Sequence, residues 1–356
     1  MNTSVTIDGD GHVIEDAERI VDFLPKGFRS WLPAVKMEKL FPPLDHFHQM
    51  PTDKRGAGRG DVGPEEWREF LDDVGIGATV LYPTKALACG RIRDRQWSVA
   101  ISRAYNDWLS ETYCKVDDRF HGMAILPIMD PDAAAEELVR AVKELGFKGA
   151  MLPSHGMSNN LGAPMYEPIY DAASSLGACI AVHGGVHEGF GFDDFYVYAG
   201  VHALGHPFGQ LVSFASLVLG GVLDRHAGAR FAFLEGGISW IMLALERLDE
   251  SYETHVPWSN EGVIQLKDGE DPADYILRRI REHRIYIGCE GDESLLPQVV
   301  DLIGTEALFY SSDFPHEVTT ESCKEAIAEA RENEAISEEA RANILAHNAR
   351  RFYGLS

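Results

Sequence analysis

Four side chains of the types that bind metal ions are spread along the sequence: Asp10, His12, His183 and Asp313. The first two are two residues apart, so on an extended chain both side chains point to the same face. Carboxylate oxygen and imidazole nitrogen suit zinc, and also manganese or iron in a site with a position open for water or substrate. The pattern indicates a metal site if the fold brings the four side chains together.

Each of these residues also has a structural explanation when it is taken alone. An Asp-Gly step such as Asp10-Gly11 more often serves a turn. His183 can be a hydrogen-bonded histidine of the core, and Asp313 can cap the turn into Phe314-Pro315. The metal-site interpretation therefore depends on a shared position of these residues at the ends of strands.

Short runs rich in Val, Ile, Phe and Ala alternate along the chain with amphipathic stretches that carry helix start signals. Apolar runs of this length are typical of strands buried on both faces of a parallel sheet. Eight such runs occur, at residues 4–10, 78–83, 121–128, 148–154, 178–184, 230–236, 284–289 and 307–313. Eight strand and helix units favour the α/β class and a (β/α)8 TIM-type barrel over a doubly wound sheet, which usually has about six strands. His183 and Asp313 then end the fifth and eighth strands, at the rim that carries active sites in such barrels.

The chain is interpreted as a single barrel domain over residues 1–356 with three long insertions. The insertions follow strands 1, 5 and 6 and cover about residues 24–63, 184–209 and 252–282. Loops of this length are usually functional or disordered. The aromatic side chains of the second insertion indicate either a pocket for a ring-bearing or conjugated substrate or a subunit interface.

Charge and cysteine content narrow the classes of partner and compartment. The formal net charge of −24 argues against nucleic acid, because its binding relies on clustered lysine and arginine, and it favours a small-molecule substrate. The five cysteines are scattered without a C-x-x-C pair, which indicates reduced thiols and no thiolate zinc site. No secretion signal and no apolar run of about 18 residues is present, so we expect a cytoplasmic protein without a membrane span.

Further polar side chains near the predicted strand ends are candidates for contacts with a substrate. Arg91 and Arg93 follow the second strand, where an arginine can hold a carboxylate through two parallel hydrogen bonds, although a solvated surface is the commoner place for such charges. Four histidines have substrate-binding or supporting roles as one interpretation: His155, His187, His206 and His316. His206, in the segment G-H-P-F-G-Q, is either a catalytic group or an N-terminal helix cap.

Several blocks of sequence, taken in order, resemble one family over nearly the whole chain. They are I-D-G-D-G-H-V-I-E, A-V-H-G, F-L-E-G-G-I-S-W followed by E-R-L-D, S-S-D-F-P-H, and N-I-L-A-H-N-A-R-R-F-Y-G-L. The chain resembles the amidohydrolase-related family that contains aminocarboxymuconate semialdehyde decarboxylase and the resorcylate-type decarboxylases. The resemblance implies a TIM-type barrel, a homodimer, and a divalent metal ion, zinc or manganese, held at the positions of Asp10, His12, His183 and Asp313. A family block has a similar His-Pro at His206.

Two positions refine what the resemblance implies. Some amidohydrolases hold a second metal through a carbamylated lysine at the end of the fourth strand, but here Lys148 stands at the start of that strand, so one metal ion is expected. On the sixth strand, the best-studied decarboxylases carry a proton-relaying histidine, and this chain has Glu235. Desolvation raises the pKa of such a carboxyl group and a cation lowers it, so Glu235 is an acid, a base, or a structural carboxylate bonded to the backbone at Gly236-Gly237.

The expected function is that of a metal-dependent, non-oxidative decarboxylase of an aromatic or conjugated carboxylic acid, with Asp313, Glu235 and His206 as catalytic groups. An acid protonates the carbon that bears the carboxylate, and CO2 then leaves. The alternative is hydrolysis of an amide, ester or lactone, with Asp313 or Glu235 taking a proton from a metal-activated water. A second alternative, a non-catalytic binding barrel, would lack metal ligands, and none is missing here.

Overall fold

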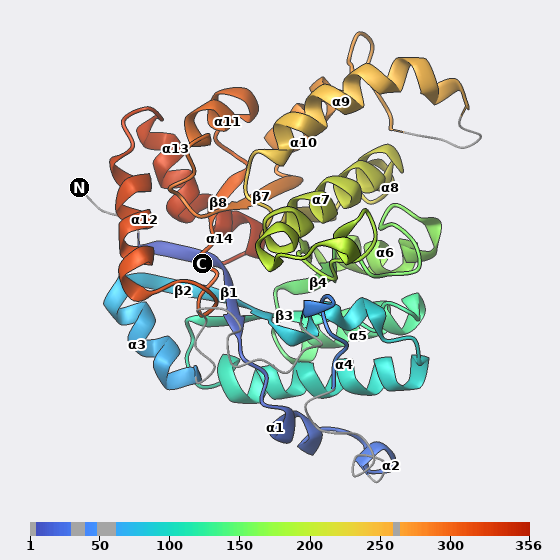
Figure 1. Cartoon of the computed structure of the whole chain (residues 1–356), viewed down its shortest axis with the longest axis vertical. Coiled ribbons are helices and arrows are strands. Elements are labelled where there is room, and N and C mark those ends of the chain that lie inside the picture. Colours follow the sequence, from blue (N-terminus) through green and yellow to red (C-terminus); the bar gives the residue numbers. More distant parts are fainter. Residues whose placement is uncertain (1–4, 30–39, 48–61, 259–263) are drawn as a thin grey trace.

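A computed structural model describes residues 5–29, 40–47, 62–258 and 264–356 of the chain. Eight parallel strands form one sheet whose spatial order follows the sequence. The strands are β1 (Thr6–Val13), β2 (Ile76–Pro83), β3 (Phe120–Ile125), β4 (Gly149–Pro153), β5 (Cys179–His183), β6 (Arg230–Phe233), β7 (Ile285–Cys289) and β8 (Leu308–Tyr310). Figure 1 shows the strands at the centre with helices ranged around them. The predicted α/β barrel is confirmed.

Helices follow the strands and cover the outside of the barrel (Figure 1). They are α1 (Ala17–Asp22), α2 (Lys26–Arg29), α3 (Pro64–Val74), α4 (Arg95–Leu109), α5 (Pro131–Glu144), α6 (Glu167–Leu176), α7 (Tyr198–Leu219), α8 (Val222–Arg225), α9 (Trp240–His255), α10 (Pro272–Arg281), α11 (Leu296–Ile303), α12 (Thr320–Glu332), α13 (Glu338–Ala342) and α14 (Asn348–Tyr353). Several begin with a side-chain cap: Asp130, for example, accepts a hydrogen bond from the backbone N–H of Ala133 at the start of α5. None of the helices in the described ranges is long and apolar enough to cross a bilayer.

The first and last strands meet at the carboxyl-end rim. The backbone N–H of Asp313 donates to the carbonyl of Asp10 at 2.9 Å, and that of His12 donates to the carbonyl of Phe314 at 2.7 Å. The ring of Phe314 in turn stacks on Phe70 of α3, with ring centroids 3.8 Å apart. The loop after β8 is thereby fixed beside the end of β1, which brings the two predicted acidic ligands to the same place.

Strand β1 is longer than the sequence indicated and contains a register shift. It continues to Val13, three residues beyond the predicted end at Asp10. Three steps along β1, from Asp8 to Gly11, match two steps along β2, as in a β-bulge. Gly11 is required there, because a Cβ would lie 2.5 Å from the ring of Trp67.

Two predicted insertions contain helical structure, and one lies partly outside the described residues. Residues 198–209 form the first half of α7, so the loop after β5 ends at residue 197. Within 252–282, the chain completes α9 and then forms α10. In the first insertion the described part includes α2, whereas residues 30–39 and 48–61 lie outside the described ranges.

Candidate active site

Three predicted metal ligands meet at the carboxyl-end rim of the barrel. Oδ1 of Asp10, Nε2 of His12 and Nε2 of His183 all lie within 4.8 Å of one another. The Asp10 oxygen is 3.6 Å from the His12 nitrogen and 3.3 Å from the His183 nitrogen. All three residues are buried. The fold therefore brings these three side chains together at one rim of the barrel.

Backbone carbonyls orient both imidazole rings. Nδ1 of His12 donates to the carbonyl of Pro83 at 2.7 Å, and Nδ1 of His183 donates to the carbonyl of Gly184 at 3.0 Å. A carbonyl only accepts, so the hydrogen of each neutral ring lies on Nδ1, and Nε2, which faces Asp10, then keeps its lone pair for a metal ion. Burial raises the pKa of Asp10 to about 7.

The buried side-chain atoms that lack a hydrogen-bond partner in the described part of the chain include three that converge here: Oδ1 of Asp10, Nε2 of His12 and Nε2 of His183. Buried polar atoms are nearly always hydrogen-bonded, so a convergent group of three without partners needs an explanation. Two imidazole nitrogens and a carboxylate oxygen are the ligand set of many divalent metal sites. The donor set present here fits a metal ion.

The fourth predicted ligand, Asp313, lies at the edge of this group. Its Oδ1 is 3.5 Å from Nε2 of His12, and its side chain is 26% exposed. The explanation as a cap is not supported, because Oγ of Ser312 accepts the hydrogen bond from the backbone N–H of Phe314. Asp313 has a φ of 55° and Glu235 a φ of 60°. Such left-handed backbone at non-glycine residues is costly and clusters at functional sites.

Glu235 lies among imidazole rings. Its Oε2 is 3.3 Å from Nδ1 of His206 and 3.5 Å from Nδ1 of His183, and Oε1 is 3.7 Å from Nδ1 of His316. Burial favours the neutral carboxyl group, but the imidazoles of His206 and His183 outweigh it and hold the pKa of Glu235 well below its usual range. These contacts do not support a carboxylate bonded to the backbone of 236–237.

His206 is the ninth residue of α7 and is buried, so it cannot cap the start of that helix. Burial is the main cause that lowers the pKa of His206, to about 3. Nδ1 of His206 is also 3.5 Å from Nε2 of His187. His206 therefore contacts Glu235 on one side and His187 on the other.

Asp45 is a site residue that the sequence analysis missed. Its Oδ2 lies 3.4 Å from Nδ1 of His187, and the backbone N–H of His187 donates to the carbonyl of Leu44 at 2.9 Å. The first and second insertions therefore contact each other beside the candidate site. No spacing signal marks Asp45, since it stands in a long segment without periodicity.

The remaining predicted substrate contacts lie farther out. Arg91 forms an ion pair with Glu188 of the second insertion, and both side chains are about one-third exposed. Arg93 reaches the carbonyl of Gly156 at 3.5 Å instead. The ring centroids of His155 and Phe190 are 5.9 Å apart. Burial lowers the pKa of His155.

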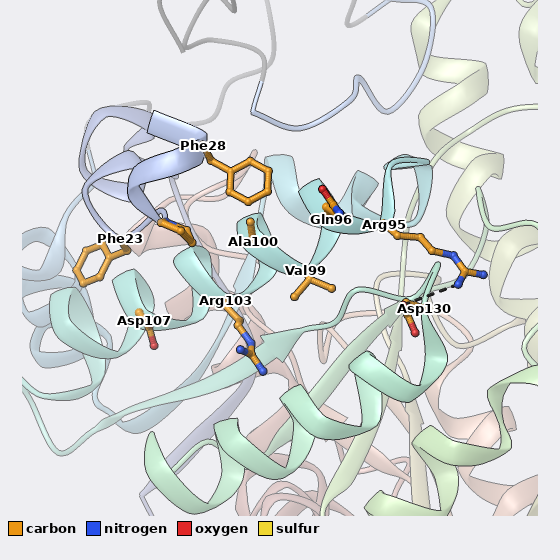
Figure 2. A pocket seen from close by; sticks show the side chains of 10 residues that line it. Phe23, Phe28, Arg95, Gln96, Val99, Ala100, Arg103, Asp107 and Asp130 are labelled. Carbon is orange, nitrogen blue, oxygen red and sulfur yellow. Dashed lines mark ion pairs between the residues drawn. The ribbon is translucent and has the colours of Figure 1, made fainter. Parts of the chain in front are cut away.

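A separate hollow of about 510 Å³ lies on the outer side of α4. Figure 2 shows Phe23 and Phe28 on one side of it and the α4 side chains Arg95, Val99 and Arg103 on the other. No candidate metal ligand lines this hollow. It is not part of the donor group at the rim.

The chain is similar to several known decarboxylases. Gamma-resorcylate decarboxylase of Rhodococcus jostii is 28% identical over 277 residues, which are 70% of this chain and 76% of that protein. The solved 5-carboxyvanillate decarboxylase of Sphingomonas paucimobilis has a TM-score of 0.76 at 21% identity, with 99% of both chains covered. A 5-carboxyvanillate decarboxylase of Novosphingobium aromaticivorans, solved with manganese and a nitrobenzoic acid, has a TM-score of 0.69 at 18% identity, covering 98% of this chain and 96% of that one.

The family model described as amidohydrolase matches residues 7–355, which is nearly the whole chain. This match agrees with the resemblance found in the sequence blocks and with the eight-stranded barrel. The chain belongs to the amidohydrolase family and is an enzyme.

Proposed function

We propose that this enzyme is a metal-dependent, non-oxidative decarboxylase of an aromatic or conjugated carboxylic acid. The observation that carries the proposal is the group of three buried donor atoms without partners, from Asp10, His12 and His183, in a chain whose curated relatives include an aromatic acid decarboxylase. The structure contributes the donor geometry, and the relatives contribute the class of reaction.

One divalent ion, Zn2+ or Mn2+, is proposed at this position, held by Asp10, His12, His183 and Asp313. A bound ion supplies positive charge that attracts a substrate carboxylate and an adjacent hydroxyl or carbonyl oxygen. A single ion is proposed because Lys148, the residue that would have to hold a second, precedes β4 at the opposite end of the barrel from the rim.

The chain's own acids and imidazoles handle the proton. Asp313 and Glu235 face the same ring, that of His316, at 2.7 and 3.7 Å. A proton held among these three groups is delivered to the substrate carbon that bears the carboxylate. The C–C bond then breaks, its electron pair returns to the conjugated system, and CO2 leaves. His206 is proposed to support Glu235, which it contacts at 3.3 Å.

The outer part of the site is proposed to bind the rest of the substrate. Arg91, His155 and His187 are the candidates, together with His316 nearer the metal position. Arg91 is already paired with Glu188. A substrate carboxylate would therefore have to compete with that glutamate, so the carboxylate that is lost is better placed at the metal.

The proposed setting is a homodimer in the cytoplasm, acting on a small molecule without nucleic acid or membrane. All five cysteines are free, which is consistent with a reducing compartment. Light scattering on the purified protein tests the dimer: a mass near twice 39.4 kDa is expected, and the monomer mass would contradict it.

The hydrolase alternative uses the same donor atoms, and no contact among the described residues favours it. The non-catalytic alternative is set aside, because the donor set is complete and the family relatives are enzymes.

The reaction class is tested with a panel of hydroxybenzoates and unsaturated acids, incubated with the metal-loaded enzyme in D2O. Decarboxylation releases CO2 and leaves deuterium at the former carboxylate carbon. Cleavage of ester, amide or lactone analogues without CO2 release from any acid would contradict the proposal and favour hydrolysis.

A further inference from the structure

The segment that follows β2 supports two imidazole rings of the site. The carbonyl of Pro83 accepts from Nδ1 of His12 at 2.7 Å. The hydroxyl Oγ1 of the next residue, Thr84, lies 3.0 Å from Nε2 of His316. Two adjacent residues therefore hold a candidate metal ligand and the ring that lies between Asp313 and Glu235.

The hydrogen bonds of Thr84 determine which nitrogen of His316 carries a hydrogen. The hydroxyl donates its single proton to the carbonyl of Val13 at 2.9 Å. Oγ1 therefore acts as an acceptor toward Nε2, and Nε2 must be protonated. The other nitrogen, Nδ1, lies 2.7 Å from Oδ1 of Asp313, and a second proton between these two atoms completes that hydrogen bond.

A buried carboxylate leaves the Thr84 hydroxyl available for this contact. Thr84 precedes the 3-10 helix η4 (Lys85–Arg91), and a threonine in that position usually caps the helix with its own hydroxyl. Here Glu15 caps instead: its carboxylate accepts from the backbone N–H groups of Thr84, Lys85 and Ala86 at 3.1, 3.0 and 2.8 Å. Glu15 is 5% exposed and belongs to the first family-like sequence block.

We propose that Thr84 is a positioning residue that fixes the ring orientation and the Nε2–H form of His316, and that Glu15 holds the segment in the required conformation. The inference rests on the proposed function in one respect only, namely that His316 takes part in the reaction. The hydrogen on Nε2 follows from the hydrogen bonds of Thr84, whatever the reaction is.

The test compares Thr84→Val, which removes the hydroxyl at nearly constant volume, with Thr84→Ser, which keeps it. Loss of partners that orient groups around a metal typically costs about 10- to 100-fold. We expect Thr84→Val to lower kcat by about 10- to 100-fold with KM changed less than about twofold, and Thr84→Ser to restore most of kcat. Thr112→Val is the matched control, since Thr112 is also buried and its hydroxyl has no hydrogen-bond partner among the described residues.

A second readout does not depend on activity. In the zinc-loaded protein labelled with 15N-histidine, the Nε2 signal of His316, assigned with His316→Gln, should have the protonated form in the wild type and in Thr84→Ser. Thr84→Val, which offers no acceptor to Nε2, should shift this signal. Glu15→Gln should weaken the signal of the protonated form. The amide NH2 of glutamine replaces one of the two oxygens that accept hydrogen bonds from the backbone of residues 84–86.

The outcomes separate this inference from the proposed function. An unchanged His316 signal and unchanged kcat in Thr84→Val would overturn the inference, and so would a folded Thr84→Ser variant that loses both. If the wild type decarboxylates no acid of the panel, the proposed function fails, and the 15N signal in the Thr84 variants still decides the inference. If Thr84→Val does not fold, Thr84→Ser decides it in the same way.

Discussion

Two buried polar groups in this barrel are organised in opposite ways. The first group surrounds Glu137, a fully buried residue of α5 that faces α4. Its carboxylate accepts hydrogen bonds from Asn106 at 2.7 Å, from Arg103 at 3.2 Å and from Arg140 at 2.7 and 2.8 Å. Asn106 also donates to and accepts from the backbone of Ile125. In this group every acceptor of the carboxylate is used.

At the rim, by contrast, Asp10, His12 and His183 are equally buried, but the atoms that face one another have no partner in the described part of the chain. A satisfied buried network adds rigidity, whereas an unsatisfied one lowers stability unless a ligand completes it. The comparison indicates that Glu137 serves the fold and that the rim serves a bound ion.

The largest effect is expected at the rim. His183→Ala removes one proposed metal ligand, so metal content and kcat should fall by more than the roughly 10- to 100-fold typical of outer partners. The free energy of unfolding of the metal-free protein should also fall, because the variant loses the hydrogen bond to Gly184 and leaves a cavity in place of the buried ring. Metal analysis, steady-state kinetics and urea denaturation measure these quantities. Full metal content in the variant would contradict the proposal that His183 is a metal ligand.

Glu235→Gln should affect catalysis without affecting metal content. General acid–base catalysis contributes about 10²- to 10⁴-fold, so a loss of kcat in that range is expected when the carboxyl group becomes an amide. The ratio of metal to protein in the same sample is the control. A variant with wild-type kcat would remove Glu235 from the proton chemistry.

Glu137→Ala should show the reverse pattern. It removes an acceptor that Asn106 shares with two arginines. We expect a loss of about 2–3 kcal/mol in the free energy of unfolding, since the arginine heads partly reach solvent. kcat per folded molecule should not change. Glu136→Ala, an exposed neighbour on α5, is the matched control. Loss of metal in Glu137→Ala would show that the two groups are not independent.

A histidine far from the rim predicts how the free energy of unfolding depends on pH. Burial lowers the pKa of His121, at the start of β3, to about 4 from an ordinary 6.5. Between these values the unfolded chain binds the extra proton, so the stability contribution is complete above pH 6.5 and is lost as pH falls toward 4. His121→Gln should flatten the pH dependence of the unfolding free energy over this window, with His255→Gln, at an exposed position, as control. An unchanged slope would contradict a half-buried His121 that is neutral over this pH range.

Residue types and spacing were sufficient to predict the strands and the rim. Apolar runs located all eight strands, and their alternation with helices predicted the barrel. The D-x-H step and the strand-end positions of His183 and Asp313 brought the donor atoms to one place without knowledge of any distance. Parallel strands that all end at one rim make this type of inference possible.

The supporting residues were not predictable in the same way. Asp45 and Thr84 stand in segments without periodicity, and their contacts, with His187 and His316, cross 142 and 232 residues of sequence. Glu15 belongs to a recognisable block, but its role depends on three backbone N–H groups that the sequence does not distinguish. The helix α7 begins earlier than the sequence predicts, because residues 198–209 are rich in aromatic residues and glycine and contain Pro207.

We propose that the atoms of Asp10, His12 and His183 that lack hydrogen-bond partners hold the ion on which the reaction depends. The most direct measurement strips the protein of metal with a chelator and titrates Mn2+ or Zn2+ back while CO2 release from an accepted acid is followed. The expected result is one ion bound per chain, with activity rising in proportion to occupancy. Full activity of the stripped protein, or activity restored without stoichiometric binding, would contradict the claim.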